Sequence, residues 1–302
     1  MPKIASLGED ALVALLTKGL GTGSGILKGP GDDCAVLGSK RQKTPLTLFK
    51  TDCIVGGVHF LPDADPAKVG WKAMARAVSD IAAMGGYPVA ALATLVLHAD
   101  TPIAFARGLY RGFRKAERVF EFAVVGGETS STPAKGANII SVSMLGYVEP
   151  KRCILRSTAQ AGDKIYVTGQ LGGSGDAGGH LTFQPRLEEA RWLAGHFKPT
   201  AMMDLSDGLA KDLPRLADAS SLGYEIDADA IPRKRSISID RAVGEGEDYE
   251  LLFTIRLNLA TALESAWQKT FPRLKLSSVG TMLRDPNERS EFCRQGWDHF
   301  SG

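Results

Sequence analysis

The stretch PAKVGWKAMARAVSDIAAMGGYPVAALATLVL, residues 66–97, decides the fold class of this chain. Pro66 suits the first turn of a helix. Apolar residues recur at helical spacing from Val69 to Ile81, and the Gly85-Gly86 pair ends the helix. The apolar run 89–97 follows at once and is typical of a strand. A helix that leads directly into a strand indicates a mixed α/β domain.

Strands and helices alternate in both halves of the chain. Before Pro150 we expect helices at 9–18 and 103–118, a glycine-rich loop at 19–31, and strands at 34–37, 46–51, 122–125 and 138–148. Beyond it we expect helices at 206–219 and 257–268 and strands at 164–168, 224–227, 250–255 and 276–279. The sequence therefore predicts two α/β or α+β domains, residues 1–150 and 151–302.

The length and composition of the chain exclude several classes of function. A length of 302 residues fits about two domains, and a net charge of +2 is too small to indicate nucleic acid or a membrane surface as partner. No signal-peptide pattern is seen, and the longest apolar stretch, 88–97, is far shorter than a membrane span. The four cysteines, at 34, 53, 153 and 293, form no C-x-x-C pair, so we expect reduced thiols in the cytoplasm.

Six acidic clusters share one design, with a carboxylate at a strand end or a helix start and usually a glycine beside it. They are Gly31-Asp32-Asp33, Thr51-Asp52, Ser79-Asp80, Gly127-Glu128-Thr129, Asp204-Leu205-Ser206-Asp207-Gly208 and Gly246-Glu247-Asp248-Tyr249-Glu250. Singly, such pairs are most often turns or helix caps, and Ser206 is a candidate cap. A core cannot bury six of them unpaired. Oxygen-only ligands favour a hard cation such as magnesium.

Three further residues have both a functional and an ordinary interpretation. Arg156 offers bidentate donors for a nucleotide phosphate, or is a surface arginine. His59 contacts a substrate, or is structural. Trp297 stacks on a flat heteroaromatic ring, or anchors the end of the chain. The P-loop and protein-kinase motifs are absent, whereas residues 173–178 fit G-x-G-x-x-G and leave a dinucleotide-dependent oxidoreductase as an alternative.

The same motifs, in order across essentially the whole chain, resemble the thiamine-monophosphate kinase family of the aminoimidazole ribonucleotide synthetase superfamily. The matching runs are at 31–36, 51–60, 79–85, 126–129, 166–169, 204–209, 246–251 and 297–300. The resemblance implies a two-domain α/β fold whose N-terminal halves pair into a homodimer. It also implies ATP and several magnesium ions in the cleft between the halves, and thiamine monophosphate as the acceptor.

The resemblance also implies roles for single residues. Metal ligands would be Asp33, Thr51, Asp52, Asp80, Asp204, Asp207 and Glu128, which stands where the family has aspartate. Contacts to ATP would come from Gly127, Glu128, Arg156 and Ser206, and contacts to thiamine monophosphate from His59, Glu247 and Trp297. Lys50 departs from the family, whose members usually have a small hydroxyl residue there, so that one metal site is altered or its charge is supplied by the lysine.

The acceptor would be a phosphate ester with a second pKa of about 6, so it needs no general base to become a nucleophile. We therefore expect direct in-line transfer without a phosphoenzyme, resting on positioning and charge neutralisation. Other ATP-using enzymes of the superfamily, similar to aminoimidazole ribonucleotide synthetase or selenophosphate synthetase, are the nearest alternatives. A nucleotide-binding protein without turnover is another.

Overall fold

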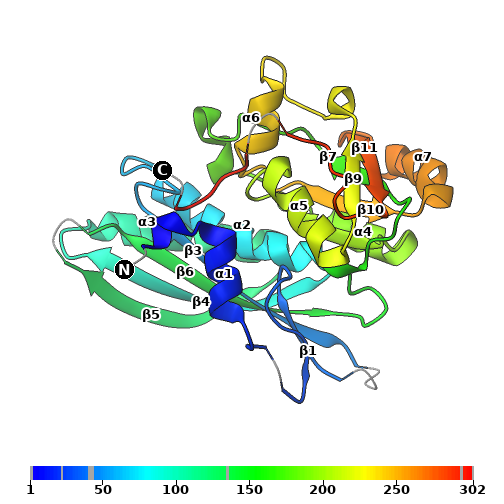
Figure 1. Cartoon of the computed structure of the whole chain (residues 1–302). Helices are drawn as coiled ribbons and strands as arrows, with labels where there is room; N and C mark the ends of the chain where they lie inside the picture. Colours follow the sequence, from blue (N-terminus) through cyan, green and yellow to red (C-terminus); the bar gives the residue numbers. More distant parts are fainter. Residues whose placement is uncertain (1–2, 22, 40–43, 134–135, 293–294, 301–302) are drawn as a thin grey trace.

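The computed structural model describes residues 3–21, 23–39, 44–133, 136–292 and 295–300. Its first half contains a six-stranded sheet and its second half a five-stranded sheet (Figure 1). A long helix of the first half lies between the first sheet and the elements of the second half (Figure 1). This architecture confirms the predicted mixed α/β fold class.

The first sheet has the strand order β1-β2-β3-β6-β4-β5. Its strands are β1 (Ile26–Lys28), β2 (Ala35–Leu37), β3 (Leu46–Val55), β4 (Tyr87–His98), β5 (Ala123–Thr132) and β6 (Ile139–Val148). Only β4 and β5 run parallel, because helix α3 (Ile103–Phe120) supplies the crossover that a parallel pair needs. Within β3, residues 48 and 54 are buried against the helices, whereas residues 49, 51 and 53 are exposed.

Helix α2 (Pro66–Ala83) is the centre of the molecule. The side chain of Asp65 caps its first turn by accepting a hydrogen bond of 2.9 Å from the backbone amide of Ala67. Fourteen of its eighteen residues are buried, because the first sheet covers one side and the second half covers the other. Helix α3 packs closely against it, and a Cβ at Gly112 would lie only 2.2 Å from the carbonyl oxygen of Ala67.

The second sheet is antiparallel, with the order β8-β10-β7-β11-β9. Its strands are β7 (Lys164–Thr168), β8 (Ala201–Asp204), β9 (Gly223–Ile226), β10 (Leu251–Ile255) and β11 (Leu276–Leu283). Ile165 and Val167 pack on the side of helix α5 (Leu209–Ser220), whereas Tyr166 packs toward α4 (Leu187–His196) and α7 (Ala260–Thr270). Both faces are therefore covered, which explains why all five residues of β10 are buried.

Several boundaries differ from the predicted ones. Ser206 is not a helix cap, because α5 begins at Leu209 after Gly208, whose φ of 96° favours glycine. The segment predicted as a helix from 257 begins as the 3-10 turn η5 (Leu257–Leu259). Strands β1 and β8 and helix α6 (Ile239–Gly244) were not predicted.

The remaining elements are short. They are helix α1 (Glu9–Thr17) and the 3-10 turns η1 (Ile4–Ser6), η2 (Arg156–Thr158), η3 (Asp176–Leu181) and η4 (Ala228–Ala230). Among the described residues, none of the helices has both the length and the apolar character that crossing a bilayer requires. Cys34, Cys53 and Cys153 carry free thiols, and Cys293 lies outside the described residues.

Candidate active site

Three buried carboxylates from three different elements meet beside α2. Asp33 precedes β2, Asp80 lies in the last turn of α2, and Asp204 ends β8. Each is at most 6% exposed, and one oxygen atom from each lies within 4.8 Å of the others. Like charges buried at this spacing repel one another strongly. A hard cation with oxygen ligands fits this group of side chains.

Basic and hydroxyl side chains surround these three carboxylates. The ammonium group of Lys50 lies 2.9 Å from Oδ1 of Asp80. The guanidinium of Arg156 holds Asp33 through two contacts, Nε to Oδ2 at 3.2 Å and Nη2 to Oδ1 at 2.5 Å. The third carboxylate, that of Asp204, instead accepts a hydrogen bond of 2.6 Å from the hydroxyl of Ser79. Two of the three carboxylates are therefore paired with a positively charged side chain.

Burial dominates the electrostatics of the group. It raises the pKa of Asp204 to about 6, with the neighbouring charge of Asp33 adding to the effect. Burial also raises the pKa of Asp80 well above its usual range, although Lys50 opposes the shift. For Lys50, burial acts to lower the pKa, but the attraction of Asp80 and Asp52 is larger and raises it above its ordinary value. The carboxylates are thus crowded enough to favour any added cation.

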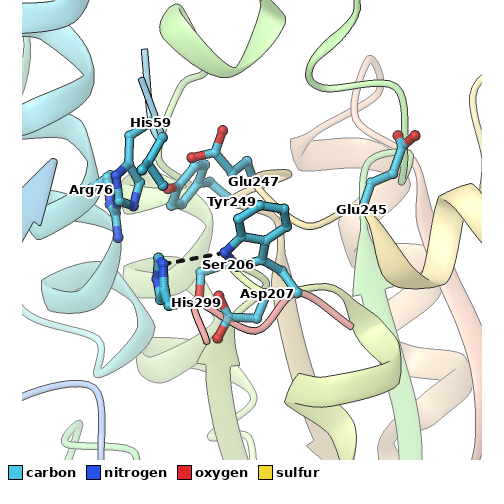
Figure 2. A pocket seen from close by; sticks show the side chains of 10 residues that line it. His59, Arg76, Ser206, Asp207, Glu245, Glu247, Tyr249 and His299 are labelled. Atoms are coloured by element: carbon cyan, nitrogen blue, oxygen red, sulfur yellow. Dashed lines mark hydrogen bonds between the residues drawn. The ribbon is translucent and has the colours of Figure 1, made fainter. Parts of the chain in front are cut away.

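A pocket of about 120 Å³ lies beside α2, which contributes Arg76 to its lining (Figure 2). His59, Arg76, Asp207, Glu247, Tyr249 and Trp297 are among the residues that line it. Arg76 and Asp80 are four residues apart on α2, so their side chains lie on one face of the helix. The pocket and the three carboxylates are therefore neighbours along α2.

His59 enters the pocket as a neutral ring. Its Nδ1 accepts a hydrogen bond of 3.1 Å from the backbone amide of Val55. Burial lowers its pKa to about 4, and the nearby charges of Arg76 and Lys72 act in the same direction. At neutral pH the ring thus carries its proton on Nε2, which leaves that atom as a donor. The ring of His299 lies 5.3 Å away, centroid to centroid.

Glu247 enters the pocket as a carboxylate. Its Oε2 lies 2.9 Å from Nδ1 of His180, and its Oε1 lies 2.6 Å from Nζ of the fully buried Lys72. Burial would raise the pKa of Glu247, but the hydrogen bond from His180 and the charge of Lys72 outweigh burial and hold it at about 2. For Lys72 itself, burial outweighs the attraction of Glu247 and lowers the pKa to about 8.

Trp297 anchors the end of the chain, as one of its two interpretations predicted, while its stacking on a substrate ring stays a prediction. Its backbone is anchored, because its amide donates to the carbonyl of Asp207 at 2.9 Å and its carbonyl accepts from Lys211 Nζ at 2.6 Å. Trp297 lines the pocket and is 47% exposed, and its indole Nε1 donates to Nδ1 of His299 at 3.4 Å. The anchored backbone thus presents a flat ring to the pocket.

The seven predicted metal ligands do not all lie together. Asp33, Asp80 and Asp204 form the group described above. Two more are close by: Asp52 pairs with Arg76 at 3.0 Å, and Asp207 pairs with Arg215 at 2.5 Å and lines the pocket.

Thr51 and Glu128 are exposed on the opposite face of the first sheet, because successive strand residues point to opposite faces. Thr51 of β3 is in register with Ser143 of β6. Glu128 accepts a hydrogen bond of 2.9 Å from the backbone amide of Thr129. Their roles as metal ligands stay predictions.

The predicted ATP contacts are also separated. Ser206 lines the pocket, and Arg156 holds Asp33. Gly127 lies in β5, where a Cβ would be 1.9 Å from the carbonyl oxygen of Ala93. The packing of β4 against β5 therefore requires glycine there by itself, and the role of Gly127 in ATP binding stays a prediction.

The glycine loop at 173–178 does not have the geometry of a dinucleotide site. The amide of Gly172 donates to Asp248 at 3.0 Å, and that of Gly173 donates to Glu245 at 2.7 Å. Carboxylates thus already take the amides that a pyrophosphate would need. The six-residue 3-10 helix η3 begins inside the loop at Asp176, and the next α-helix, α4, begins only at Leu187.

The sequence reasoning missed several site residues, among them Lys72, Arg76, Tyr249 and His299. A signal for two of them was present, because Lys72, Arg76 and Asp80 recur every four residues along the predicted helix. Tyr249 and His299 lie inside motifs that had been singled out for other residues.

Comparison with known proteins places the chain in a family. The family described as AIR synthase related protein, N-terminal domain, matches residues 31–148, and the corresponding C-terminal domain matches residues 160–268. A thiamine-monophosphate kinase of Salmonella typhimurium is 33% identical and covers 90% of this chain and 92% of its own. The chain belongs to the thiamine-monophosphate kinase family. Its family and fold, as predicted from the motifs, are confirmed.

Further relatives and solved structures resemble the chain over most of its length. The thiamine-monophosphate kinase of Aquifex aeolicus is 34% identical over 99% of this chain and 100% of its own. A solved structure described as AaThiL complexed with AMPPCP and TMP superposes with a TM-score of 0.83 at 28% identity, covering 99% of both chains. The Escherichia coli hydrogenase maturation protein HypE, at 18% identity, 95% and 96% coverage and a TM-score of 0.70, shares the fold.

Proposed function

We propose that this chain transfers the γ-phosphoryl group of ATP to the phosphate of thiamine monophosphate, giving thiamine diphosphate and ADP. One observation carries the proposal: a buried group of three carboxylates and a pocket lined by an indole, a neutral imidazole and a carboxylate lie side by side along α2. Kinase chemistry needs a cation-binding centre next to a site for the acceptor, and this arrangement supplies both.

The pocket suits the acceptor chemically. Thiamine carries a cationic thiazolium ring and a flat pyrimidine ring. The exposed indole of Trp297 offers a π face to either ring. The anionic Glu247 complements the thiazolium charge, and the neutral His59 donates a hydrogen bond without adding repulsion.

The phosphate groups would meet at the carboxylate end of the pocket. Asp33, Asp80 and Asp204 would hold magnesium, which supplies charge neutralisation for the transferring phosphoryl group. Arg156 has the fork of donors that binds a nucleotide phosphate in a bidentate way. Because the acceptor phosphate is already ionised near neutral pH, no residue has to remove a proton from it. We therefore propose direct in-line transfer, for which a phosphoenzyme would be contrary evidence.

The open face of the first sheet supports a proposal of homodimer formation. Phe49, Leu92, Leu145 and Tyr147 lie on this face with exposed fractions of 40% to 49%. Contiguous apolar side chains of this kind mark interaction surfaces. A second copy of residues 1–150 would cover them, while residues 151–302 would complete the cleft. The three free thiols agree with a cytoplasmic enzyme.

A coupled ADP-release assay tests the function. ADP should form when ATP, Mg²⁺ and thiamine monophosphate are all present, and thiamine diphosphate should appear in equal amount. Free thiamine is the control, because it has the rings but lacks the acceptor phosphate. Equal rates with thiamine, or no ADP with thiamine monophosphate, would refute the proposed acceptor.

A further inference from the structure

Lys50 places a basic side chain inside the carboxylate group. It lies in the middle of β3, where Lys50 is in register with Met144 of β6 and its side chain is on the face that holds Asp52. Its Nζ is 2.9 Å from Oδ1 of Asp80, and only 24% of the Lys50 side chain and 9% of that of Asp80 are exposed. A lysine in such a contact belongs to the group of buried side chains around Asp80, unlike a surface lysine whose ammonium group moves freely in water.

The charges show what this lysine does. When all three are ionised, Asp33, Asp80 and Asp204 bring three negative charges within 4.8 Å of one another. Arg156 compensates one and Lys50 another, so the resident side chains leave the equivalent of one negative charge. With a neutral residue at position 50, the same carboxylates would carry one more uncompensated charge and would call for a further cation.

Lys50 and Arg156 differ in how readily each can give up its contact with a carboxylate of the group. Arg156 belongs to the short turn η2 and is proposed above to bind a nucleotide phosphate, so its guanidinium can exchange Asp33 for ATP. Lys50 is held by the pairing of β3 with β6 along the whole strand, from Leu46 to Val55. The backbone of Lys50 is therefore held in place by the sheet, and the 2.9 Å contact puts its ammonium group beside Asp80.

We propose that Lys50 is a permanent cation of this centre, and that its ammonium group takes the place of one divalent metal ion. The inference rests on the proposed function, and it adds that this chain binds one divalent ion fewer than it would with a small hydroxyl side chain at position 50. The class of ligand concerned is a hard divalent cation such as Mg²⁺, held by carboxylate oxygens.

The test counts Mn²⁺, used as the probe for Mg²⁺, by electron paramagnetic resonance on the full chain, with saturating AMPPCP. Lys50→Ser should bind one more Mn²⁺ per chain than the unchanged protein, whereas Lys50→Arg, which keeps the charge, should not. Lys28→Ser is the matched control, because Lys28 pairs at 3.7 Å with Asp32, outside the group of three. It should leave the count unchanged.

A second readout needs no bound nucleotide. In EDTA, the melting temperature of Lys50→Ser should fall by on the order of 5 °C, because Asp80 loses its buried partner, and Mn²⁺ should restore it. The unchanged protein should respond less to Mn²⁺. Should Lys50→Ser not fold in EDTA, Lys50→Gln, which keeps most of the length without the charge, takes its place in both measurements.

Equal Mn²⁺ counts in the unchanged protein and in Lys50→Ser overturn the inference. So does a Lys50→Ser variant whose only defect is weaker AMPPCP binding, because Lys50 would then be a phosphate ligand. Neither readout uses turnover. Equal counts in a protein that still phosphorylates thiamine monophosphate therefore refute the role of Lys50 alone, whereas a failed ADP-release assay refutes the proposed function alone.

Discussion

The ammonium group of Lys72 lies 2.6 Å from Oε1 of Glu247, and this contact ties α2 of the first half to the loop before β10 in the second half. Lys72 is fully buried, and it also donates to the carbonyl of His59 at 2.8 Å. A single buried amine therefore fixes two of the proposed substrate contacts. The backbone of Glu247, with φ at 58°, is held in a conformation that few non-glycine residues adopt.

Removing this amine should destabilise the protein. We expect Lys72→Met to lower the free energy of unfolding by about 3 kcal/mol, because it leaves the carboxylate of Glu247 without its buried partner. Urea denaturation measures the loss. The double variant Lys72→Met/Glu247→Gln should cost less than the two single changes added together.

Arg289→Met is the control for this cycle. Arg289 pairs with Asp218, whose side chain is 64% exposed, so we expect a change of about 0.5 kcal/mol or less. Strictly additive effects of the Lys72 and Glu247 changes would contradict a direct coupling.

His59 should make stability depend on pH. Its pKa is about 4 in the folded protein against an ordinary 6.5. Between these values the unfolded chain binds more protons, so stability falls as the pH falls through this window. His59→Gln should make the slope of unfolding free energy against pH shallower by at most about 1.4 kcal/mol per unit. Superimposable slopes for the two proteins would show that burial does not suppress protonation of His59.

The buried carboxylates should control turnover. We expect Asp80→Asn to lower kcat by about a thousandfold at limiting Mg²⁺ while circular dichroism shows a folded protein, because charge neutralisation is lost where the phosphoryl group moves. Asp176→Asn is the matched change at an exposed carboxylate that pairs with Arg241, and it should have little effect. Near-normal kinetics of Asp80→Asn would count against the metal site.

Trp297 should contribute mainly to acceptor binding. We expect Trp297→Ala to raise KM for thiamine monophosphate about tenfold with a smaller change in kcat, because a stacked ring is worth about 1 kcal/mol or somewhat more. Trp297→Phe should recover much of the loss, since a flat ring returns. If KM for ATP rose instead, the pocket would belong to the nucleotide.

The open face of the first sheet should determine the oligomeric state. We expect Leu145→Arg, a change in the middle of that face, to convert a dimer into monomers in analytical ultracentrifugation, because an unpaired charge would be buried in the interface. Leu257→Arg is the control, since Leu257 is 62% exposed in η5, which belongs to the second half and not to the first sheet. A monomer before mutation would contradict the dimer.

Much of the fold could be predicted from local patterns. Strand β7 begins and ends at the predicted residues, and the helix after Pro66 and the strand that follows it lie where periodicity placed them. The start of helix α5 was predicted wrongly. Ser206 has the residue type of an N-cap, but the chain turns at Gly208 before α5 begins at Leu209. A cap depends on the direction from which the chain enters the helix, and that direction is fixed by packing.

The sequence by itself determined the family, the mixed α/β class, and the carboxylates that could bind cations, because motifs and hydrophobic period are local properties of the chain. Tertiary structure alone decided which of them meet. Asp33, Asp80 and Asp204 are far apart in sequence and converge on α2, whereas Thr51, a direct neighbour of Asp52, points to the other face of the sheet. Strand pleating separates neighbours, and the packing of both halves on one helix joins distant residues.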